Sequence, residues 1–452
     1  MPVWRQQWLG SVLLFLTLWM GFGALINARN MDSFNLQHIG IEAIVERGQF
    51  WLEGSPTPQL QPLGDTFHHE GHVYAAKQPG QFMWGALAYW PVQAAGIRYQ
   101  TDYHRAAALA TWGSASLWLA LGLVALQRLS LRWRPEQRWA GHALALTAAT
   151  GTHLLAYSGL PHHDLIAAGL IACGFACSVT ARSAFGWKQL LLATCAGLSY
   201  GWALSTSMLP AFALAPLCLY ALISLPWKAS LMGLLGILLG LLPLGVYNSL
   251  SFGQPWLMAN VVGNFADTFW RFEASNLLDK LHFYARQSLL YAPILWQGLI
   301  GLCRLPARLE AASIGLALLA LLGYIANIDT VGHCQYGPRY LLPLLPLLCL
   351  GLLGLWRGPW PLFAGALSLL AAGYGLLINL GGALDGAMYC SYWEFAGARS
   401  WERVLHGGAL IRPLAVLQWP ALGCGLLWLL WLRSAGGIPR RAAASGSTPS
   451  PA

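Results

Sequence analysis

Charged residues are scarce in this chain, and their scarcity excludes most classes of soluble protein. Only 10% of the 452 residues are charged while 56% are hydrophobic, whereas soluble domains carry about 25% charged residues. Motifs for soluble nucleotides are also missing, because the sequence contains no P-loop and no DxD motif. The nine cysteines include no CxxC motif, so they predict neither a zinc site nor a disulfide framework.

Long apolar segments are what the sequence has in abundance. A hydrocarbon core of about 30 Å needs roughly 20 apolar residues for each helical span. The sequence therefore predicts an all-α polytopic membrane protein with about 12 transmembrane helices (roughly 11–13). The predicted spans centre near residues 8–27, 105–127, 138–157, 165–181, 189–208, 210–226, 229–248, 288–303, 310–327, 339–356, 359–379 and 413–433.

The basic residues indicate an orientation in the membrane. A net charge of +9 would suggest nucleic acid for a soluble chain, but here Lys and Arg lie mostly in short loops, where they mark the cytoplasmic side. We expect no nucleic-acid partner, cytoplasmic N- and C-termini, and chemistry on the external (periplasmic) face of the plasma membrane. The loops concerned carry Arg128, Arg132, Arg134 and Arg138, Arg182 and Lys188, Arg304 and Arg308, and Arg433, Arg440 and Arg441.

Acidic residues are nearly absent from these inside loops, where only Glu136 and Glu310 fall. Loops longer than about 12–15 residues are usually functional or disordered. Residues 1–433 are predicted to form a single transmembrane domain. A tail rich in Ser, Pro, Ala and Gly follows at 434–452 and is predicted to be disordered and cytoplasmic. The long external segments of the domain are expected at 28–104, 249–287 and 380–412.

Two features of the external segments leave alternatives open. Residues 79–97 are long enough to cross the membrane, but a crossing there would turn the arginine loops outward, so we favour a helix in the outer interface. Cys334 and Cys390 lie on the outer side, where they either form a disulfide or remain two free thiols.

The first external loop opens with Asp32 at the exit of the first span. The segment that follows places Phe34 and Ile41 on one side and Glu42 on the other, which predicts an interfacial amphipathic helix. The simplest role for Asp32 is to cap that helix, a contribution of about 0.5–2 kcal/mol. A catalytic role is the alternative.

Further along, the stretch DTFHHEGHVYAAKQPG concentrates ionisable groups before the interfacial helix. A site that holds a phosphate beside lipid needs cations and hydroxyl donors, and Lys77 can supply a point charge. Lys77 could instead extend its charge to the interface while Pro79 starts a helix. His68, Glu70 and His72 are weak candidates for metal ligands, and we predict that no metal is required, although a divalent ion remains compatible with the sequence.

Four motifs, taken together and in order, give the chain a family resemblance. It resembles integral-membrane glycosyltransferases of the C superfamily (GT-C), the group that includes protein O-mannosyltransferases and lipid A aminoarabinose transferases. The motifs are Asp32 after the first span, the Tyr-x-x-Lys-x-Pro-Gly of Tyr74 to Gly80, YNSLSFGQPW from Tyr247 to Trp256, and YGPRYLLPLLP from Tyr336 to Pro346.

The resemblance implies a polyprenyl-phosphate-linked sugar donor and an external active site. It also implies that Asp32 is the general base and that Lys77 contacts the donor phosphate. Many relatives carry a second acid directly after the aspartate, whereas this chain has Ser33. The acids that could compensate, or bind the sugar or the acceptor, are Glu42, Asp65 and Asp164.

Reasoning from the chemistry adds further candidates to the site. Arg339 can form a two-pronged contact with phosphate oxygens as a lysine cannot, although it could equally be an interface anchor beside Tyr340. The hydroxyls of Tyr74 and Tyr340 are candidates to donate hydrogen bonds to the donor phosphate. The turn LPHHDL places His162, His163 and Asp164 together, either to bind sugar hydroxyls or the acceptor, or with Asp164 only capping the next helix.

The reaction predicted from these features is a single, inverting displacement at the anomeric carbon by an acceptor hydroxyl. The acceptor could be a protein, a lipid or a glycan. The alternative is a polytopic transporter or lipid-linked sugar flippase, which should place ionisable groups near the middle of its spans. His153 is the main polar candidate of that kind.

Overall fold

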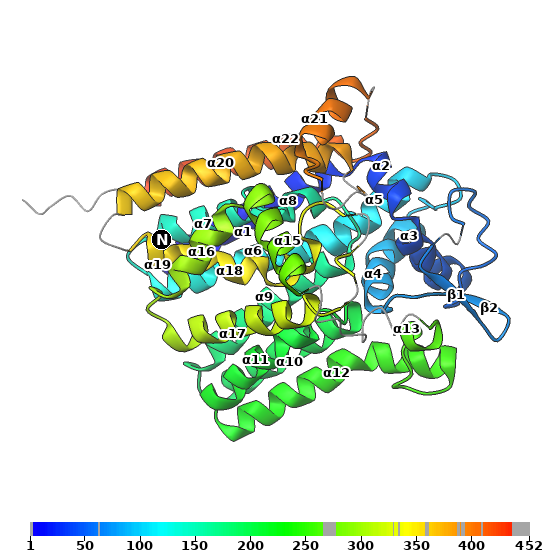
Figure 1. The fold of residues 1–452 in the computed structure, drawn as a ribbon, viewed down its shortest axis with the longest axis horizontal. Coiled ribbons are helices and arrows are strands. Elements are labelled where there is room, and N and C mark those ends of the chain that lie inside the picture. Colours follow the sequence, from blue (N-terminus) through cyan, green and yellow to red (C-terminus); the bar gives the residue numbers. More distant parts are fainter. Residues whose placement is uncertain are drawn as a thin grey trace, which may run out of the picture.

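The computed structural model describes residues 3–435 with short gaps, at residues 62–63, 265–276, 329, 333–334, 358–360, 387–388, 390–393 and 408–409. The described chain is almost entirely helical (Figure 1), which confirms the predicted all-α polytopic class. In the described part, strands form one two-stranded antiparallel sheet, β1 (Thr66–His69) with β2 (His72–Ala75).

Seven helical segments in the described part are long and apolar enough to cross a membrane. They are α1 (Val3–Leu25), α5 to α6 (Tyr103–Thr111, Leu117–Trp133, joined by the π-helical turn η2, Trp112–Ser116), α9 (His163–Ala181), α12 (Trp227–Phe252), α17 (Arg308–Ile325), α20 (Pro361–Asp385) and α22 (Gln418–Ala435, after the 3-10 turn η5, Ala415–Leu417).

The other predicted spans also coincide with helices, but several are interrupted. Residues 187–206 and 211–224 form α10 (Trp187–Thr206) and α11 (Ala211–Ser224). The interrupted segments are α7 and α8 (Arg138–Thr150, Leu154–Tyr157), α15 and α16 (Leu277–Tyr291, Ile294–Leu302), and η4, α18 and α19 (Arg339–Leu344, Leu345–Cys349, Leu352–Leu355). Prolines such as Pro293 and Pro343 remove a backbone donor and disfavour a continuous helix. The number of membrane crossings stays a prediction.

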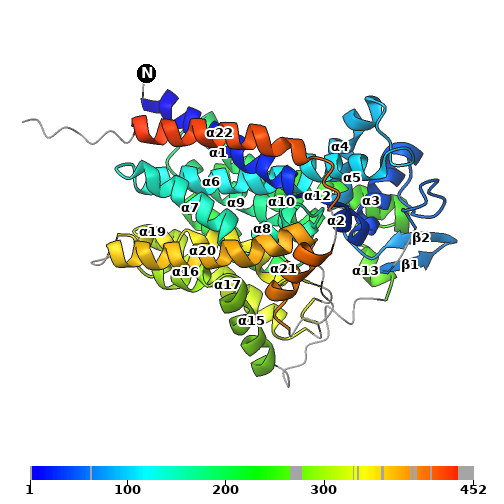
Figure 2. The same cartoon turned by 90° about the horizontal axis from the view of Figure 1, so that it is seen from above.

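The three segments predicted to be external contribute elements to the same end of the helical bundle. This end carries α2 (Ala28–Ser33), α3 (Asn35–Glu42), the π-helical turn η1 (Ala43–Arg47), α4 (Gly80–Ala94), α13 (Ala259–Val262), α21 (Gly397–His406) and the β-hairpin. The two views of the ribbon agree on this arrangement (Figures 1 and 2). The bundle therefore has one end that is rich in loops and short helices.

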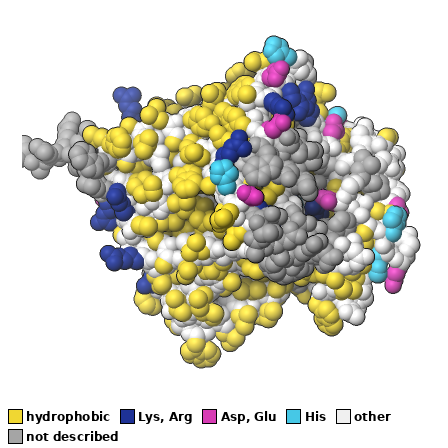
Figure 3. Space-filling model, viewed as in Figure 1, with side chains coloured by type: hydrophobic (Ala, Val, Ile, Leu, Met, Phe, Trp, Pro, Cys, Tyr) yellow, Lys and Arg dark blue, Asp and Glu magenta, His cyan; other side chains and the backbone are white. Residues whose placement is uncertain are grey.

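Charge is distributed in the same polarised way. On the face drawn in Figure 3, a broad hydrophobic zone lies between a left end that shows Lys and Arg side chains and a right part that shows acidic, histidine and further basic side chains together. Exposed leucines of α12 and α20, such as Leu238 and Leu369, contribute to the apolar exterior. This pattern suits a membrane-spanning bundle with an apolar middle. Which end faces outward stays a prediction.

Helices α10 and α12 pack closely enough to fix the position of the site-bearing end of α10. A Cβ atom added at Gly197 would lie 1.8 Å from the carbonyl oxygen of Gly233, and one at Gly236 would lie 2.3 Å from that of Thr194. Small residues allow this close backbone approach between membrane helices. The C-terminal end of α10, which ends at Thr206, is therefore held rigidly against α12.

The loop after the first span, residues 28–104, forms a small packed unit with its own apolar core. Ile39, Ile41, Phe82 and Tyr99 are among its buried residues. The predicted two-sided helix after Asp32 is wrong in one respect, because Glu42, expected on the polar side, is fully buried. The reason is an internal ion pair with Arg47 at 2.9 Å. Burial raises the pKa of the Glu42 carboxyl, and Arg47 partly opposes that rise.

Segment 79–97 forms the 15-residue helix α4, which is not among the apolar helices long enough to span a bilayer. It packs against α3, α5 and the end of α10. The position of α4 relative to the membrane stays a prediction. The disorder of the tail also stays a prediction, because residues 436–452 lie outside the described part of the chain.

Cys334 and Cys390 also lie outside the described residues. Their neighbours Gln335 and Tyr389 form an antiparallel bridge, in which the Gln335 N–H donates to the Tyr389 carbonyl at 2.9 Å. The two alternatives, a disulfide or two free thiols, both stay predictions. Peptide mapping without reduction distinguishes them, because a disulfide gives a linked 334–390 peptide whereas free thiols give complete alkylation of both cysteines.

Candidate functional site

A pocket lies where the segments after β2 and α10 meet the starts of α9 and η4, and we refer to it as the Lys77 pocket. It encloses about 130 Å³, which is well above the roughly 10–15 Å³ that one water needs. A phosphate-sized group therefore fits. The lining residues are Ala76, Lys77, Gln78, His163, Asp164, Ser207, Met208, Leu209, Ala211, Phe212, Asn260, Tyr324, Arg339 and Tyr340.

The two walls of this pocket differ in chemistry. One is polar and carries Lys77, Arg339 and Asp164. The other is apolar and comes from the ends of α11 and α17, where the rings of Phe212 and Tyr324 stack at 4.0 Å. Such a pocket suits an amphiphilic ligand, because a charged group and a hydrocarbon segment can each meet a matching wall.

Lys77 lies just after the β-hairpin, and Asp65, which lies just before the hairpin, holds its side chain. The Lys77 Nζ lies 2.8 Å from Asp65 Oδ2, and the Ala76 N–H donates to the Asp65 carbonyl at 2.7 Å. Burial raises the pKa of the Asp65 carboxyl, but the Lys77 charge and hydrogen bond outweigh burial and hold that pKa below its ordinary value. Asp65, predicted to bind sugar or acceptor, is therefore the counter-ion of Lys77.

An aromatic cluster fixes the hairpin against the end of α12. Tyr74 lies over Phe252 with 5.3 Å between ring centroids, and Tyr247 and Phe67 complete the cluster. Tyr74 is 5% exposed and does not line the Lys77 pocket. The motifs around Tyr74 and Tyr247 thus pack against each other. Their aromatic residues do not line the pocket, but they fix the hairpin that precedes Lys77.

The positions of Pro79 and Gly80 in the fold give a structural reason for the proline and the glycine that follow Lys77. Pro79 is the N-cap of α4, a position where its missing N–H costs nothing. A Cβ atom at Gly80 would lie 2.5 Å from the carbonyl oxygen of Ser205 and 2.7 Å from the backbone nitrogen of Thr206. Only glycine allows this approach, which sets the Lys77 segment against α10.

Replacing Gly80 with alanine should therefore lower the stability of the fold by about 1–3 kcal/mol, the usual effect of overpacking. Thermal unfolding in detergent measures the change. The matched control is Gly21→Ala in α1, where an added Cβ atom meets nothing within 4 Å. Equal melting temperatures for the two variants would contradict the close contact.

Arg339 is presented by a rigid turn on the far side of the pocket. The Tyr336 N–H donates to the Tyr157 hydroxyl at 3.0 Å, and the Tyr336 hydroxyl donates to the Ile378 carbonyl at 2.7 Å. The Arg339 guanidinium lies over the ring of Tyr340, 5.1 Å from its centroid. Its buried Nε has no hydrogen-bond partner among the described residues, so it can bind an anion in the pocket.

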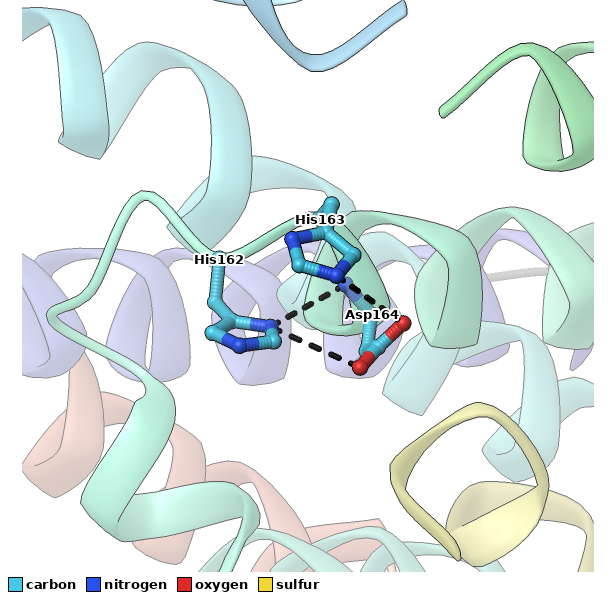
Figure 4. Close-up of side chains that lie close together, drawn as sticks. All are labelled: His162, His163 and Asp164. Atoms are coloured by element: carbon cyan, nitrogen blue, oxygen red, sulfur yellow. Dashed lines mark hydrogen bonds and ion pairs between the residues drawn. The ribbon is translucent and has the colours of Figure 1, made fainter. Parts of the chain in front are cut away.

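His163 and Asp164 form the acidic part of the polar wall at the start of α9 (Figure 4). Asp164 is 1% exposed, and its Oδ1 accepts a hydrogen bond from the Ser207 hydroxyl at 2.8 Å. Asp164 Oδ2 and His163 Nδ1 are buried without a hydrogen-bond partner in the described structure. Buried polar atoms are normally paired, so both atoms are available to hydrogen-bond a ligand in the pocket.

His162 has a different role from its two neighbours. Its Nδ1 accepts a hydrogen bond from the Asp164 N–H at 3.1 Å, which makes His162 the N-cap of α9. The alternative that Asp164 caps this helix is therefore wrong. His162 does not line the Lys77 pocket, and its ring instead meets those of Phe34 and Tyr157.

Asp32 lies in a second cavity, which we call the Asp32 pocket. It is lined by Arg29, Asp32, Ser33, Asp385, Gly386 and Arg403. Asp32 lies within α2 and caps neither α2 nor α3, whose N-caps are Asn27 and Phe34. The capping explanation for Asp32 is therefore wrong. Its carboxylate is 57% exposed, so a ligand can reach it beside the ring of His104.

Several groups hold the helix that carries Asp32. Arg29 Nη1 lies 2.8 Å from Asp385 Oδ1, which Arg403 Nε also approaches at 3.3 Å. The Asn27 amide donates to the carbonyls of Ala383 and Leu384 at 3.1 Å each. The α2 helix is thus tied to the end of α20, and the position of Asp32 is fixed by contacts between distant segments.

The loop histidines predicted as weak metal ligands do not gather. His72 Nδ1 lies 2.6 Å from Glu53 Oε1, while its ring stacks on Trp51. Glu70 is mostly exposed at the hairpin turn, and His68 pairs with Val73 across the hairpin. Among the described residues, the set with metal-ligand spacing is His162, His163 and Asp164.

Several residues at the two pockets were missed by reading the sequence. Ser207 and Asn260 line the Lys77 pocket, and the Nε2 of His104 lies 3.4 Å from Asp32 Oδ1. Asp385 and Arg403 complete the Asp32 pocket. None of these residues belongs to a motif, so only their polar character beside an apolar span could have singled them out.

Comparison with known proteins gives limited similarity. No family model matches the chain, and no curated protein matches it. Among solved structures it is similar to crystal structures of ArnT from Cupriavidus metallidurans, one bound to undecaprenyl phosphate and one in the apo state. Sequence identity is 16% in both cases, coverage is 94% of this chain and 78% and 76% of those chains, and the TM-scores are 0.49 and 0.47. The roles of the site residues therefore rest on this chain's own geometry.

Proposed function

We propose that this protein is an inverting glycosyltransferase that moves a sugar from a polyprenyl-phosphate donor to an acceptor hydroxyl at the outer face of the membrane. The observation that carries the proposal is the Lys77 pocket. It unites Lys77 and Arg339, from opposite parts of the sequence, beside an apolar wall at the ends of membrane helices. A phosphate attached to a long hydrocarbon chain matches both walls.

The donor phosphate is assigned to the cationic side of this pocket. Lys77 supplies a point charge, and Arg339 supplies N–H donors in a fixed plane. Both stabilise the negative charge that develops on the phosphate as it leaves the sugar. The Tyr340 ring lies under the guanidinium and orients it, while the Asp65 carboxylate keeps Lys77 directed at the pocket.

Asp32 is assigned the role of general base. As the acceptor oxygen forms its bond to the anomeric carbon, the bond from that carbon to the phosphate oxygen breaks. The acceptor proton passes to Asp32, and polyprenyl phosphate is released. The two pockets are neighbours in the chain's packing, because Phe34, two residues after Asp32, contacts His162, which precedes the pocket-lining His163, with 5.7 Å between ring centroids.

A transporter or lipid-linked sugar flippase is the alternative function. His153 is the observation in its favour, because this polar side chain is fully buried between α7 and α8, within a predicted span. The clustering of Lys77, Arg339 and Asp164 in one pocket at the ends of the spans favours chemistry on a headgroup over passage along the helices.

Incubation with a panel of polyprenyl-phosphate sugars tests the proposal. Purified protein in lipid nanodiscs, supplied with a membrane extract as the source of acceptor, should convert at least one donor to free polyprenyl phosphate, detected by mass spectrometry. Boiled protein is the control. Movement of an intact lipid-linked sugar between leaflets of proteoliposomes, without cleavage of any donor, would favour the flippase instead.

A further inference from the structure

We propose that a groove between α1, α22 and the α7–α8 segment binds one anionic glycerophospholipid, with its phosphate at Arg412 and an acyl chain along the two long helices. We refer to it as the Arg412 groove. Its volume is about 530 Å³, within the roughly 300–1,000 Å³ of small-molecule sites. In the described structure it shares no lining residue with the Lys77 pocket or the Asp32 pocket. The groove is therefore separate from the sites assigned to the donor phosphate and the general base.

Small side chains on α1 and α22, which lie side by side (Figure 2), leave this groove open. Near the start of α1 the two helices are in tight contact, because a Cβ atom added at Gly10 would lie 2.3 Å from the ring of Trp431. Near the end of α1, a Cβ atom at Gly21 would meet nothing within 4 Å. Gly21 lines the groove, together with Ala421 and Gly425 of α22. A larger side chain at Gly21 would therefore extend into the groove.

The length of the groove matches one leaflet of a bilayer. Its lining on α22 runs from Gln418 to Leu429, a helical rise of about 16 Å. Half of a hydrocarbon core of about 30 Å is roughly 15 Å. On α1 the lining runs from Thr17 to Leu25, the residue at which the helix ends. An acyl chain that enters at the loop-rich end of the bundle would thus reach the middle of the bilayer within the groove.

The deeper part of the groove suits hydrocarbon, because the polar atoms that line it are already paired. The hydroxyls of Thr17 and Thr150 each donate to a carbonyl of their own helix at 2.8 Å. The indole N–H of Trp428 donates to His142 Nδ1 at 3.0 Å. A sugar or a peptide placed here would lose its hydrogen bonds to water without replacement, whereas an acyl chain has none to lose.

The loop-rich end of the groove carries a cation and an amide. Gln418 is the first residue of α22, and Arg412 lies in the segment that leads into it. Within the described part of the chain, neither side chain has a hydrogen bond or an ion pair. Both can therefore donate to phosphate oxygens. The described lining includes no acidic residue, so the ammonium group of a zwitterionic lipid would find no partner, and an anionic headgroup is favoured.

The position of Arg412 connects the groove to the helix that carries Asp32. The Ala28 N–H, at the start of α2, donates to the carbonyl of Ile411 at 2.9 Å. A lipid bound at Arg412 should therefore stabilise the junction of α1, α2 and α22. Lipid binding is measured without a sugar donor or an acceptor, so its outcome does not depend on the proposed transferase activity.

Native mass spectrometry of the full-length protein, delipidated in detergent, tests the proposal. Phosphatidylglycerol and phosphatidylcholine with the same acyl chains are titrated separately. We expect one phosphatidylglycerol per chain, bound about fivefold more tightly than phosphatidylcholine, because one arginine attracts an anionic headgroup to about that extent. Arg412→Gln should remove this preference. Gly21→Leu should abolish the tightly bound lipid, because leucine fills the groove, and phosphatidylglycerol should then no longer raise the melting temperature.

Two variants serve as matched controls and should bind phosphatidylglycerol like the unaltered protein. Gly315→Leu makes the same change in α17, at a position where an added Cβ atom also meets nothing within 4 Å but which does not line the groove. Arg98→Gln removes an exposed arginine between α4 and α5. Each variant must elute as a single species, and Arg412→Gln serves where Gly21→Leu fails to fold.

Three results would overturn the proposal. The first is equal affinity of the unaltered protein for the two lipids, or full retention of phosphatidylglycerol by both Gly21→Leu and Arg412→Gln. The second is a dimer mass that Gly21→Leu reduces to a monomer mass, which would assign the groove to a second copy of the chain. The third is displacement of phosphatidylglycerol by a lower concentration of polyprenyl phosphate, which would assign the groove to the donor lipid.

Discussion

Replacing Asp32 with asparagine is expected to lower the rate of sugar transfer about 10²–10⁴-fold, the usual contribution of a general base. Asparagine keeps the size of the side chain but cannot accept the acceptor proton. Asp32 is 57% exposed and caps no helix, so the substitution should leave the fold and the donor affinity nearly unchanged. Release of polyprenyl phosphate in nanodiscs, followed by mass spectrometry, measures the rate.

Asp102→Asn is the matched control for this experiment. Asp102 is another exposed acid of the first external loop, and its role is to cap α5 through the Arg105 N–H. Asparagine caps about as well as aspartate, so the rate of this variant should stay within twofold of the unaltered protein. A folded Asp32→Asn protein that transfers sugar within a few-fold of the normal rate would remove Asp32 from the mechanism. Asp164 would then be the next candidate base.

Loss of donor affinity is the second large effect, expected on replacing Lys77 or Arg339 with glutamine. A hydrogen bond to a charged group contributes about 1.5–3 kcal/mol, so each substitution should weaken binding of the lipid-linked sugar about 10–100-fold. Lys77 is 21% exposed and its partner Asp65 is 59% exposed, which means that water can solvate Asp65 once Lys77 is removed. Binding to protein in nanodiscs, by microscale thermophoresis, measures the affinity.

Two further variants separate a specific contact from a general charge effect. Lys188→Gln removes an exposed lysine beside Trp187, in a loop predicted to be cytoplasmic, and should not change donor affinity. Arg339→Lys keeps the charge but loses the planar donors, so its affinity should lie between those of the unaltered protein and Arg339→Gln. Unchanged donor affinity in both Lys77→Gln and Arg339→Gln would assign these residues to membrane anchoring.

The helices could be predicted from the sequence because hydropathy is a local property. Each predicted span coincides with a helix or with two or three short helical segments, and the interruptions occur at residues such as Gly151 and Pro293. Lys77, Asp164 and Arg339 were also singled out, because binding a phosphate-linked sugar needs cations for the phosphate and polar groups for the sugar. Their meeting in one pocket depends on packing, such as the contact between Gly80 and Ser205.

What the sequence could not reveal were the partners of its charged groups. Glu42 was expected on an exposed polar face, but Arg47, five residues later, draws it into a buried ion pair. Tyr74 was expected at the phosphate, yet it packs against Phe252 and supports the hairpin. Asp385, in the C-terminal part of the chain, holds α2 in place through its ion pair with Arg29. Such pairings depend on tertiary contacts, which periodicity does not encode.

The most direct test of the donor site is photo-crosslinking with a polyprenyl phosphate that carries a diazirine next to its phosphate. Peptide mapping after irradiation in nanodiscs should place the label on the segments that line the Lys77 pocket, at residues 76–78, 207–212 and 339–340. Unlabelled polyprenyl phosphate should compete with the label. Labelling confined to the arginine loops at the opposite end of the bundle, or labelling that unlabelled lipid does not reduce, would contradict the assignment of this pocket to the donor phosphate.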